Sequence, residues 1–274
     1  MYDDLILVAC GGAAARIVRE NTSKFPLKTI FIDSNEENSS LEMVSEDDDC
    51  RGDTDLSFML ALDNADTIRA QMEGRRLVFL FSMLGGGAGT GMLPVIIDLA
   101  QSCGCRVCCI LGIPWHLEPD RRGMALDAIR ENADVADRML LLDIDTIPAI
   151  YPDIRMHKIM TQVSHTVSFA IGNLAEMADG PFFSTFSQRM YTFAYTSDMD
   201  PEVAVDKALS ASMFETDPTN GKVIVTVSSA FGDSECEMIL DKIVSMSGIM
   251  PDIVKRKDSE DTKVLVFLPL KSLD

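Results

Sequence analysis

The sequence predicts an α/β protein in which a parallel sheet is followed by a long helix and then by a smaller α+β unit. Apolar strand patterns and helical patterns alternate through the first half of the chain. One helical pattern then runs from 154 to about 178, and further strands and helices follow it. Alternation of strands and helices implies a parallel sheet with helices on both faces.

The first half begins with an apolar strand at 5–9, a turn at Gly11 and Gly12, and a helix that follows directly. Further strands are expected at 28–32, 77–81, 106–112 and 139–142. Helices are expected at 63–72, 92–100 and 119–137, whereas 36–63 is expected to be irregular, with an acidic run at 46–49. This order is typical of a Rossmann-like parallel sheet, in which ligands bind at the carboxyl ends of the strands.

The second half begins with the long helix. Its apolar residues recur at spacings of four, four, four and three, which marks a buried face: Ile159, Val163, Val167, Ile171 and Leu174. Gly180 and Pro181 end this pattern, as a helix stop should. We then expect helices at 201–213 and 233–247 and strands at 222–228, 252–255 and 263–268. This half has no glycine-rich loop, so we interpret it as a companion unit.

A glycine-rich loop is the most informative segment of the chain. Five glycines in seven positions separate an apolar strand from an apolar helix: Gly85, Gly86, Gly87, Ala88, Gly89, Thr90 and Gly91. Glycine leaves backbone N–H groups open to an anion, and the following helix adds unsatisfied N–H groups and the positive end of its dipole. The sequence therefore predicts a phosphate-binding loop here.

Other polar or glycine-containing turns also follow strand ends. They comprise Gly11 and Gly12, Asp33, the segment 115–118 and the segment 143–145. Because strand ends of a parallel sheet meet at one edge, these turns are expected to converge with the glycine-rich loop on one site. The P-loop pattern G-x-x-x-x-G-K-[ST] is absent from the sequence, and so are H-E-x-x-H and G-x-S-x-G.

The composition limits the classes of partner. The net charge of −19 comes from 43 acidic and 24 basic residues, and a surface this acidic repels nucleic acid and anionic membranes. No apolar run approaches the length of about 20 residues that a membrane span needs. The first residues lack a basic leader, so we expect no signal peptide and no direct membrane insertion.

Seven cysteines at irregular spacing indicate a reduced, cytoplasmic compartment. Cys105 and Cys108 form a lone C-x-x-C within a predicted strand. Alternation along a strand turns two such side chains to opposite faces, which is poor geometry for joint metal ligation. We expect these cysteines to be buried as small hydrophobic residues.

The order of these motifs resembles the tubulin/FtsZ family. LVFLFSMLGGGAGTGMLPVIIDLA is similar to the family signature G-G-G-T-G-T-G and its apolar helix, with Ala88 at the first threonine and Thr90 at the second. LILVACGGAAARIV resembles the first glycine loop, and IFIDSN resembles the second loop. Later segments, from LLDIDTI to GKVIVTVSSAFG and DTKVLVFLPL, match in order, so the resemblance covers nearly the whole chain.

The resemblance implies a binding site for GTP or GDP with Mg²⁺. The phosphates would lie on the glycine-rich loop and on the first loop, with Gly11, Gly12 and Ala13, while Asp33 of the second loop would contact the metal or the ribose. GIPWHLEPDRRGMA resembles the segment that holds the ribose, which suggests Glu118 with Arg121 or Arg122. LLDIDTI places Asp145 at the strand end before the central helix.

The resemblance also implies a domain division and a cellular role. We expect a nucleotide-binding domain at 1–152, a central helix and connecting loop at 153–180, and an activation-like domain at 181–274. Members of this family assemble head to tail into filaments, so the first partner expected is the chain itself, and other division or cytoskeletal proteins are further candidates. A role in the cytoskeleton or in cell division follows from the same resemblance.

In this family an acidic loop after the central helix is inserted against the γ-phosphate of the next subunit and polarises the attacking water. Here the corresponding segment is GNLAEMADGPFFSTF, in which Glu176 and Asp179 are the candidate catalytic residues. They are equally compatible with being ordinary residues of the last helical turn. A carboxylate that orients water must reach within about 3 Å of it.

The chain also departs from the family. The span after the central helix is shorter, its acidic motif is not intact, and Ala13 to Ala15 stand where the family has more glycine and an asparagine. One alternative is therefore a nucleotide-binding structural or regulatory protein without efficient hydrolysis. A second is a dinucleotide-dependent oxidoreductase, because Asp33 follows Gly11 and Gly12 at the distance of a ribose-binding acid, although the pattern is not G-x-G-x-x-G.

Overall fold

The computed structural model describes residues 2–20, 27–41, 43, 50, 52–178, 182–257 and 259–273. The chain falls into two compact units, Met1–Leu141 and Leu142–Asp274. The first unit is built on parallel strands, as the sequence predicts, and the second contains both antiparallel and parallel strand pairs. The finer division at 152 and 180 stays a prediction.

The first unit is organised around a parallel sheet. β1 (Leu5–Cys10) pairs with β2 (Lys28–Ile32) on one side and with β3 (Leu77–Met83) on the other, and β3 pairs with β4 (Arg106–Ile113). β5 (Arg138–Asp143) follows β4 in the strand order. β1 is buried along its whole length, as expected for a parallel strand that helices cover on both faces.

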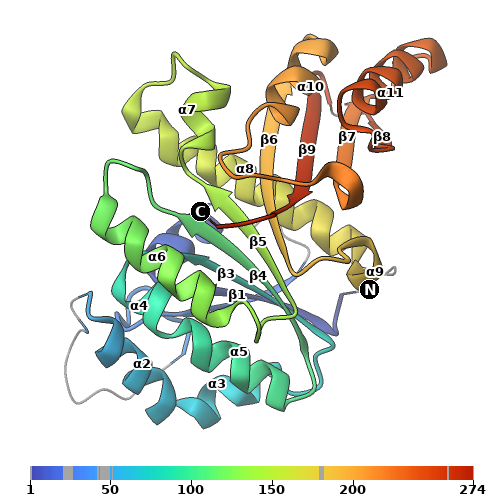
Figure 1. Cartoon of the computed structure of the whole chain (residues 1–274). Helices are drawn as coiled ribbons and strands as arrows, with labels where there is room; N and C mark the ends of the chain where they lie inside the picture. The colour runs from blue at the N-terminus through green and yellow to red at the C-terminus, as the bar shows by residue number, and fades with distance from the viewer. Residues whose placement is uncertain are drawn as a thin grey trace. The chain divides into compact units, whose positions relative to one another are not determined.

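Helices cover the two faces of this sheet unequally. α1 (Gly12–Arg19) joins β1 to β2, whereas the later crossovers run in the opposite direction through the sheet, toward β3, β4 and β5. Because such crossovers are right-handed, the later helices lie on the opposite face from α1. They are α2 (Thr54–Asp63), α3 (Ala65–Met72), α5 (Leu93–Ser102) and α6 (Pro119–Asn132), seen together below the strands in Figure 1.

The expectation that 36–63 is irregular was wrong for its last ten residues, which form α2. The side chain of Asp53 caps this helix by accepting hydrogen bonds from the N–H groups of Asp55 (2.8 Å) and Leu56 (3.0 Å). The helix sequence TDLSFMLALD has apolar residues around its whole circumference, so no single stripe with a helical period signals it. The acidic run at 46–49 lies outside the described residues.

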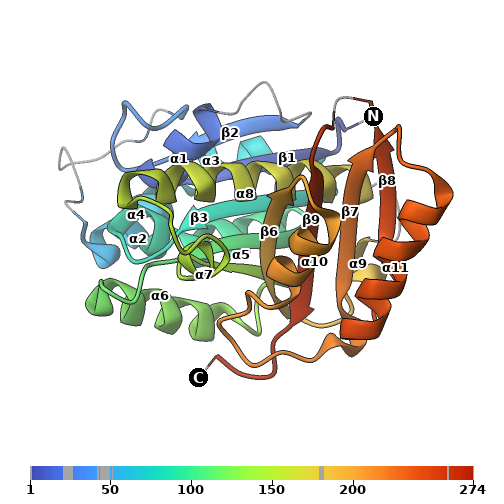
Figure 2. The same cartoon turned by 90° about the horizontal axis from the view of Figure 1, so that it is seen from above.

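The second unit combines one long helix with a four-stranded sheet. α8 (Met156–Met177) is the predicted long helix, and all five residues of its predicted apolar stripe are buried. The other elements are α7 (Thr146–Ile150), α9 (Phe182–Thr185), β6 (Met190–Asp198), α10 (Pro201–Leu209), β7 (Lys222–Ser228), α11 (Asp233–Ser247), β8 (Asp252–Arg256) and β9 (Thr262–Pro269). The strand order is β6-β9-β7-β8, as Figure 2 shows.

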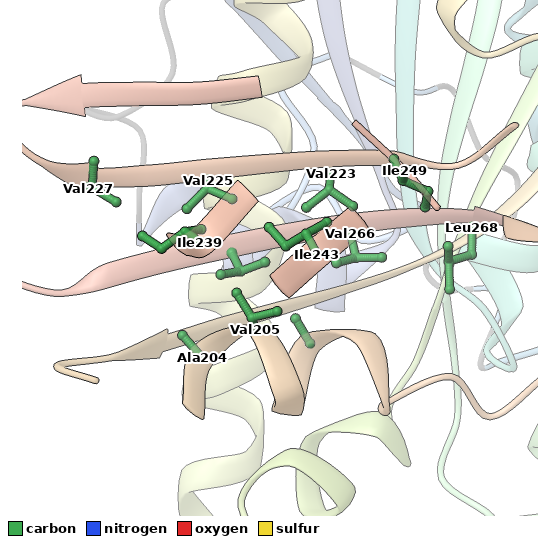
Figure 3. Close-up of a cluster of buried hydrophobic side chains, with 12 residues drawn as sticks. Ala204, Val205, Val223, Val225, Val227, Ile239, Ile243, Ile249, Val266 and Leu268 are labelled. Carbon is green, nitrogen blue, oxygen red and sulfur yellow. The ribbon is translucent and has the colours of Figure 1, made fainter. Parts of the chain in front are cut away.

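The sheet of the second unit is mixed, and one face is covered by α10 and α11. β9 runs antiparallel to both β6 and β7, whereas β8 is parallel to β7. Figure 3 shows the core between the helices and the strands, where Val205 of α10 and Ile243 of α11 meet Val225 of β7 and Val266 of β9. This packing makes the second unit an α+β structure.

Cysteines contribute to the interior of the first unit. Cys105, Cys108 and Cys109 are buried, as expected for small hydrophobic residues. Burial raises the pKa of each of these thiols, so they stay protonated at neutral pH. In the part of the chain that the structure describes, no helix is long and apolar enough to cross a bilayer.

The core of the second unit provides a direct test of its packing. Replacing Ile243, which is fully buried on α11, by alanine should lower the free energy of unfolding by about 2–5 kcal/mol, because a cavity remains between helix and sheet. The matched control is Met246→Ala on the same helix, where the side chain is 46% exposed and the expected change is within about 0.5 kcal/mol. Urea denaturation followed by circular dichroism measures both, and equal losses would contradict the assignment of the buried face.

Candidate functional site

The glycine-rich loop forms a sharp turn at the carboxyl end of β3. Gly85 has a φ of +82°, a conformation that side chains with a Cβ rarely adopt, and it leads into the short helix α4 (Gly87–Gly91). The N–H of Gly85 donates to Oγ1 of Thr90 at 2.9 Å, so the hydroxyl of Thr90 closes the loop on itself. Thr90 is buried, and its role is to hold the loop.

The first glycine loop touches the glycine-rich loop directly. Gly11 has a φ of +88°, and its N–H donates to the carbonyl oxygen of Ile32 at 2.8 Å. A Cβ placed on Gly11 would lie 2.9 Å from the nitrogen of Gly89 and 3.0 Å from its Cα. Both the backbone conformation and the close approach therefore require glycine at this position.

Ser82, the last fully buried residue of β3, braces both loops. Its hydroxyl lies 2.8 Å from the carbonyl oxygen of Gly89 and 3.2 Å from that of Cys10, and it donates to one of them at a time. A Cβ on Gly89 would lie only 2.6 Å from Oγ of Ser82. Sequence reasoning missed this residue. The available signal was a single serine inside the apolar strand LVFLFSM, directly before the glycines.

Backbone N–H groups at both loops are available to a ligand. Among the described residues, the N–H groups of Gly86, Gly87 and Ala88 have no hydrogen-bond acceptor, and the same holds for Gly12 and Ala13 at the start of α1. A Cβ on Gly86 would meet nothing within 4 Å, so this side of the loop is open. Two sets of first-turn N–H groups on adjoining loops fit the oxygens of a phosphate chain.

Asp33 lies against the start of α1, as its place after β2 predicts. A Cβ on Gly12 would lie 3.1 Å from Oδ2 of Asp33 and 2.9 Å from Nδ2 of Asn38. Asp33 as a whole is buried, with 5% of its surface exposed. Burial, with the charge of Asp33 as a second cause, raises the pKa of Cys10, so this thiol is not a nucleophile at neutral pH.

A depression of about 490 Å³ opens beside α1. It is lined by Gly12, Ala13, Arg16, Arg19, Glu20 and Asn38. Of the three alanines that replace family residues, Ala13 faces this depression, whereas Ala14 and Ala15 are fully buried. The guanidinium of Arg19 donates to the carbonyl oxygens of Glu37 and Asn38, each at 2.9 Å, and so holds the segment after β2 against α1.

The segment predicted to hold a ribose is tied to the glycine-rich loop by Arg121. Its Nε–H donates to the carbonyl oxygen of Gly85 at 2.9 Å, and the same guanidinium forms an ion pair with Glu118, the N-cap residue of α6. Arg122 instead donates to the carbonyl oxygen of Pro114 at 2.8 Å. The structure therefore brings Glu118 and Arg121 to the loop together, while Arg122 supports the turn that precedes them.

The remaining candidates belong to the second unit. Asp145 is the N-cap residue of α7, and its N–H donates to Oδ1 of Asp143 at 3.0 Å. Glu176 lies in the last turn of α8, and both of its carboxylate oxygens accept from Nη2 of Arg256, at 2.8 and 2.9 Å. Asp179 lies outside the described residues. Within those residues, no three His, Cys, Asp or Glu side chains are grouped so as to hold a metal ion.

Comparison with known families agrees with this geometry. The family model described as "Tubulin/FtsZ family, GTPase domain" matches residues 8–152, which is more than half of the chain. The chain belongs to the Tubulin/FtsZ family. The matched range contains the end of β1, the strands β2 to β5, both glycine loops and the segment with Glu118 and Arg121.

Individual members of the family are distant in sequence. The chain is 28% identical over 122 residues to the cell division protein FtsZ of Methanothermobacter thermautotrophicus, a match that covers 44% of the chain and 32% of that relative. The matched part thus spans about a third of the relative's length. A solved structure of an FtsZ dimer of M. jannaschii superposes with a TM-score of 0.83 at 16% identity, covering 98% of this chain and 88% of the other.

A second solved structure, a GTPγS-bound protofilament of CetZ2 from Haloferax volcanii, gives a TM-score of 0.74 at 16% identity. It covers 100% of this chain and 94% of the other. These likenesses confirm the predicted fold, a tubulin/FtsZ-like α/β structure.

The contact between the two loops can be tested with a pair of matched variants. Gly11 and Gly104 both have positive φ, +88° and +81°, but only a Cβ on Gly11 meets other atoms within 4 Å. Gly104→Ala should cost about 1–2 kcal/mol of unfolding free energy from backbone strain alone. Gly11→Ala should cost about 1–3 kcal/mol more, because the added methyl group overpacks against Gly89. Equal losses in urea denaturation would show that the two loops do not touch.

Proposed function

We propose that this chain binds GTP and GDP through its two glycine loops and assembles head to tail into filaments. The observation that carries the proposal is the pair of adjoining loops, Gly11–Ala13 and Gly85–Gly91, whose first-turn N–H groups have no acceptor among the described residues. Membership of the Tubulin/FtsZ family, whose matched part is a GTPase domain, supports guanine nucleotides as the ligand.

Each candidate residue has a role in this proposal. The glycine loops bind the phosphates, and Glu118, placed by Arg121, binds the ribose. Mg²⁺ fits as a cofactor, because this ion keeps several waters and is held by one or two carboxylates together with phosphates, so it needs no large group of protein ligands. When bound, Mg²⁺ neutralises phosphate charge. Asp33 and Asp145, which follow the ends of β2 and β5, are proposed as further contacts of the bound nucleotide.

Assembly would complete the hydrolytic site. In the proposal, Glu176 and Asp179 of one subunit reach the γ-phosphate bound by the next and orient the attacking water, so hydrolysis depends on filament formation. The superposed relatives are described as a dimer and as a protofilament, which supports self-association as the mode of action. The proposed role is cytoskeletal, in cell division or a related process in the cytoplasm, with other division proteins as further partners.

A second candidate function is nucleotide binding without efficient hydrolysis. Glu176 favours it, because its carboxylate is held by Arg256 in an ordinary last turn of α8. A carboxylate engaged by a guanidinium is a weaker hydrogen-bond acceptor for water than a free one. Such a chain would act as a structural or regulatory partner whose assembly is controlled by which nucleotide is bound.

Nucleotide binding is tested first with variants of the glycine-rich loop. Gly89→Val should weaken GTP and GDP binding about a hundredfold or more, equivalent to about 2.8 kcal/mol, because a side chain collides with Ser82 and distorts the loop. Gly87→Val should act in the same direction, since a Cβ there lies 2.6 Å from Gly52. Isothermal titration calorimetry measures both, with NAD as the ligand control.

The control variant is Gly123→Val on α6, where a Cβ meets nothing within 4 Å, and it should leave nucleotide affinity unchanged. Circular dichroism confirms that each variant folds. Tight NAD binding without GTP binding would support the oxidoreductase alternative and overturn the proposal.

Hydrolysis is tested by phosphate release as a function of protein concentration. Release that rises more than linearly is expected when neighbouring subunits complete each other's sites. Asp179→Ala should leave nucleotide affinity intact and abolish release, and Glu176→Gln should lower release. Unchanged release by Asp179→Ala would remove Asp179 from the catalytic role, whereas binding without any release by the unmodified protein would establish the second candidate function.

A further inference from the structure

The helix α2 is apolar on its outer face as well as on its inner face. Ser57, Leu60 and Ala61 are buried against the rest of the first unit. Large apolar side chains on the remaining surface stay exposed to solvent: Leu56 by 47%, Phe58 by 37%, Met59 by 51% and Leu62 by 44%. A surface helix normally carries polar residues opposite its buried stripe, so four such residues on ten positions mark a face that another surface covers.

A groove of about 540 Å³ lies beside this face. Phe58 of α2, Pro94 of α5 and Met124 of α6 form its apolar lining, and Met124 is itself 39% exposed. Thr90 and Gly91 of α4 also line the groove, and α4 packs against α2. α2 and α6 lie on the same face of the sheet in Figure 1, and Phe58 belongs both to the outer face of α2 and to the lining of the groove.

Three carboxylates line the groove. Asp55, Asp127 and Glu131 line it and are exposed, and no lysine or arginine is among the described residues that line it. Arg130 pairs with Asp127 at 3.0 Å, but both side chains are largely exposed, so solvent screens this pair and the rim stays negative. Such a rim repels phosphate groups, although Thr90 and Gly91 of the glycine-rich loop are also among the lining residues.

We propose that this groove binds a basic amphipathic helix of a partner protein. An apolar stripe at i, i+3, i+4 and i+7 would lie on Phe58 and Met124, and flanking lysines or arginines would pair with the carboxylate rim. The ten residues of α2 extend over about 15 Å, enough to accompany about three turns of such a helix. The three carboxylates of the rim favour a basic partner helix over a second copy as the occupant, because only a basic helix complements their charge.

The probe for this surface is a synthetic helix of about 18 residues with leucines on one stripe and lysines elsewhere, long enough to be helical when bound. Fluorescence anisotropy of the labelled peptide measures its affinity for the full chain. Two control peptides are a scrambled sequence without the stripe and a version with glutamate in place of lysine. The proposal expects the leucine–lysine peptide to bind about tenfold tighter or better than either control, with an affinity that falls as salt rises.

Variants locate the binding surface. Met124→Glu and Phe58→Glu should each lower the peptide affinity about tenfold or more, because they place a charge in the apolar lining. Glu131→Lys should lower it less and weaken its salt dependence. The matched control is Met213→Glu in the second unit, where the side chain is 47% exposed, and it should leave the affinity unchanged.

Several outcomes overturn the proposal. Equal binding of all three peptides, or the same affinity in Met124→Glu as in the unmodified chain, would show that the groove does not recognise a basic helix. Association of the chain with itself that Met124→Glu abolishes, without peptide binding, would assign the surface to a second copy. Met124 lies on a different helix from Phe58, so a folding defect of one variant leaves the other informative. The measurement needs no nucleotide, so it is independent of the proposed function.

Discussion

The close approach of Gly11 to Gly89 is the constraint on which the rest of the candidate site depends. At this point two loops from neighbouring parallel strands meet backbone against backbone, with no room for a Cβ. Ser82 lies beneath both loops, and Arg121 holds the far side through the carbonyl oxygen of Gly85. Because these contacts are made to backbone atoms, they fix the backbone of both glycine loops. The N–H groups available to a ligand are therefore held in position by the surrounding structure.

The parts of the fold that sequence patterns predicted are those governed by burial. The apolar runs of β1 and β3 are short and bounded by turns, as is typical of interior strands, and the stripe of α8 repeats with a helical period over more than four turns. α2 escaped prediction because its apolar residues do not recur with a helical period, although its buried residues do. Its sequence is apolar on every side, so periodicity carries no information about its conformation.

The candidate site was predictable in its glycines but not in its supporting contacts. Positive φ and close approach restrict positions 11 and 85 to glycine. Glycines directly after a strand can be recognised in the sequence, so these positions were predictable. The contacts of Arg121 with Gly85 and of Arg19 with Glu37 and Asn38 are made to backbone oxygens, which every residue possesses. No pattern of residue types reveals a partner of that kind. Likewise, the pairing of Glu176 with Arg256 joins positions 80 residues apart.

The distribution of the seven thiols has a practical consequence for observing this molecule at work. Five cysteines are buried, and only Cys103 and Cys236 are partly exposed. Cys103 follows α5 in the first unit, and Cys236 lies on α11 in the second. The chain thus offers one accessible attachment point in each unit without any engineering. A donor and an acceptor dye placed there would report changes in the separation of the two units, by energy transfer, as ligands are added.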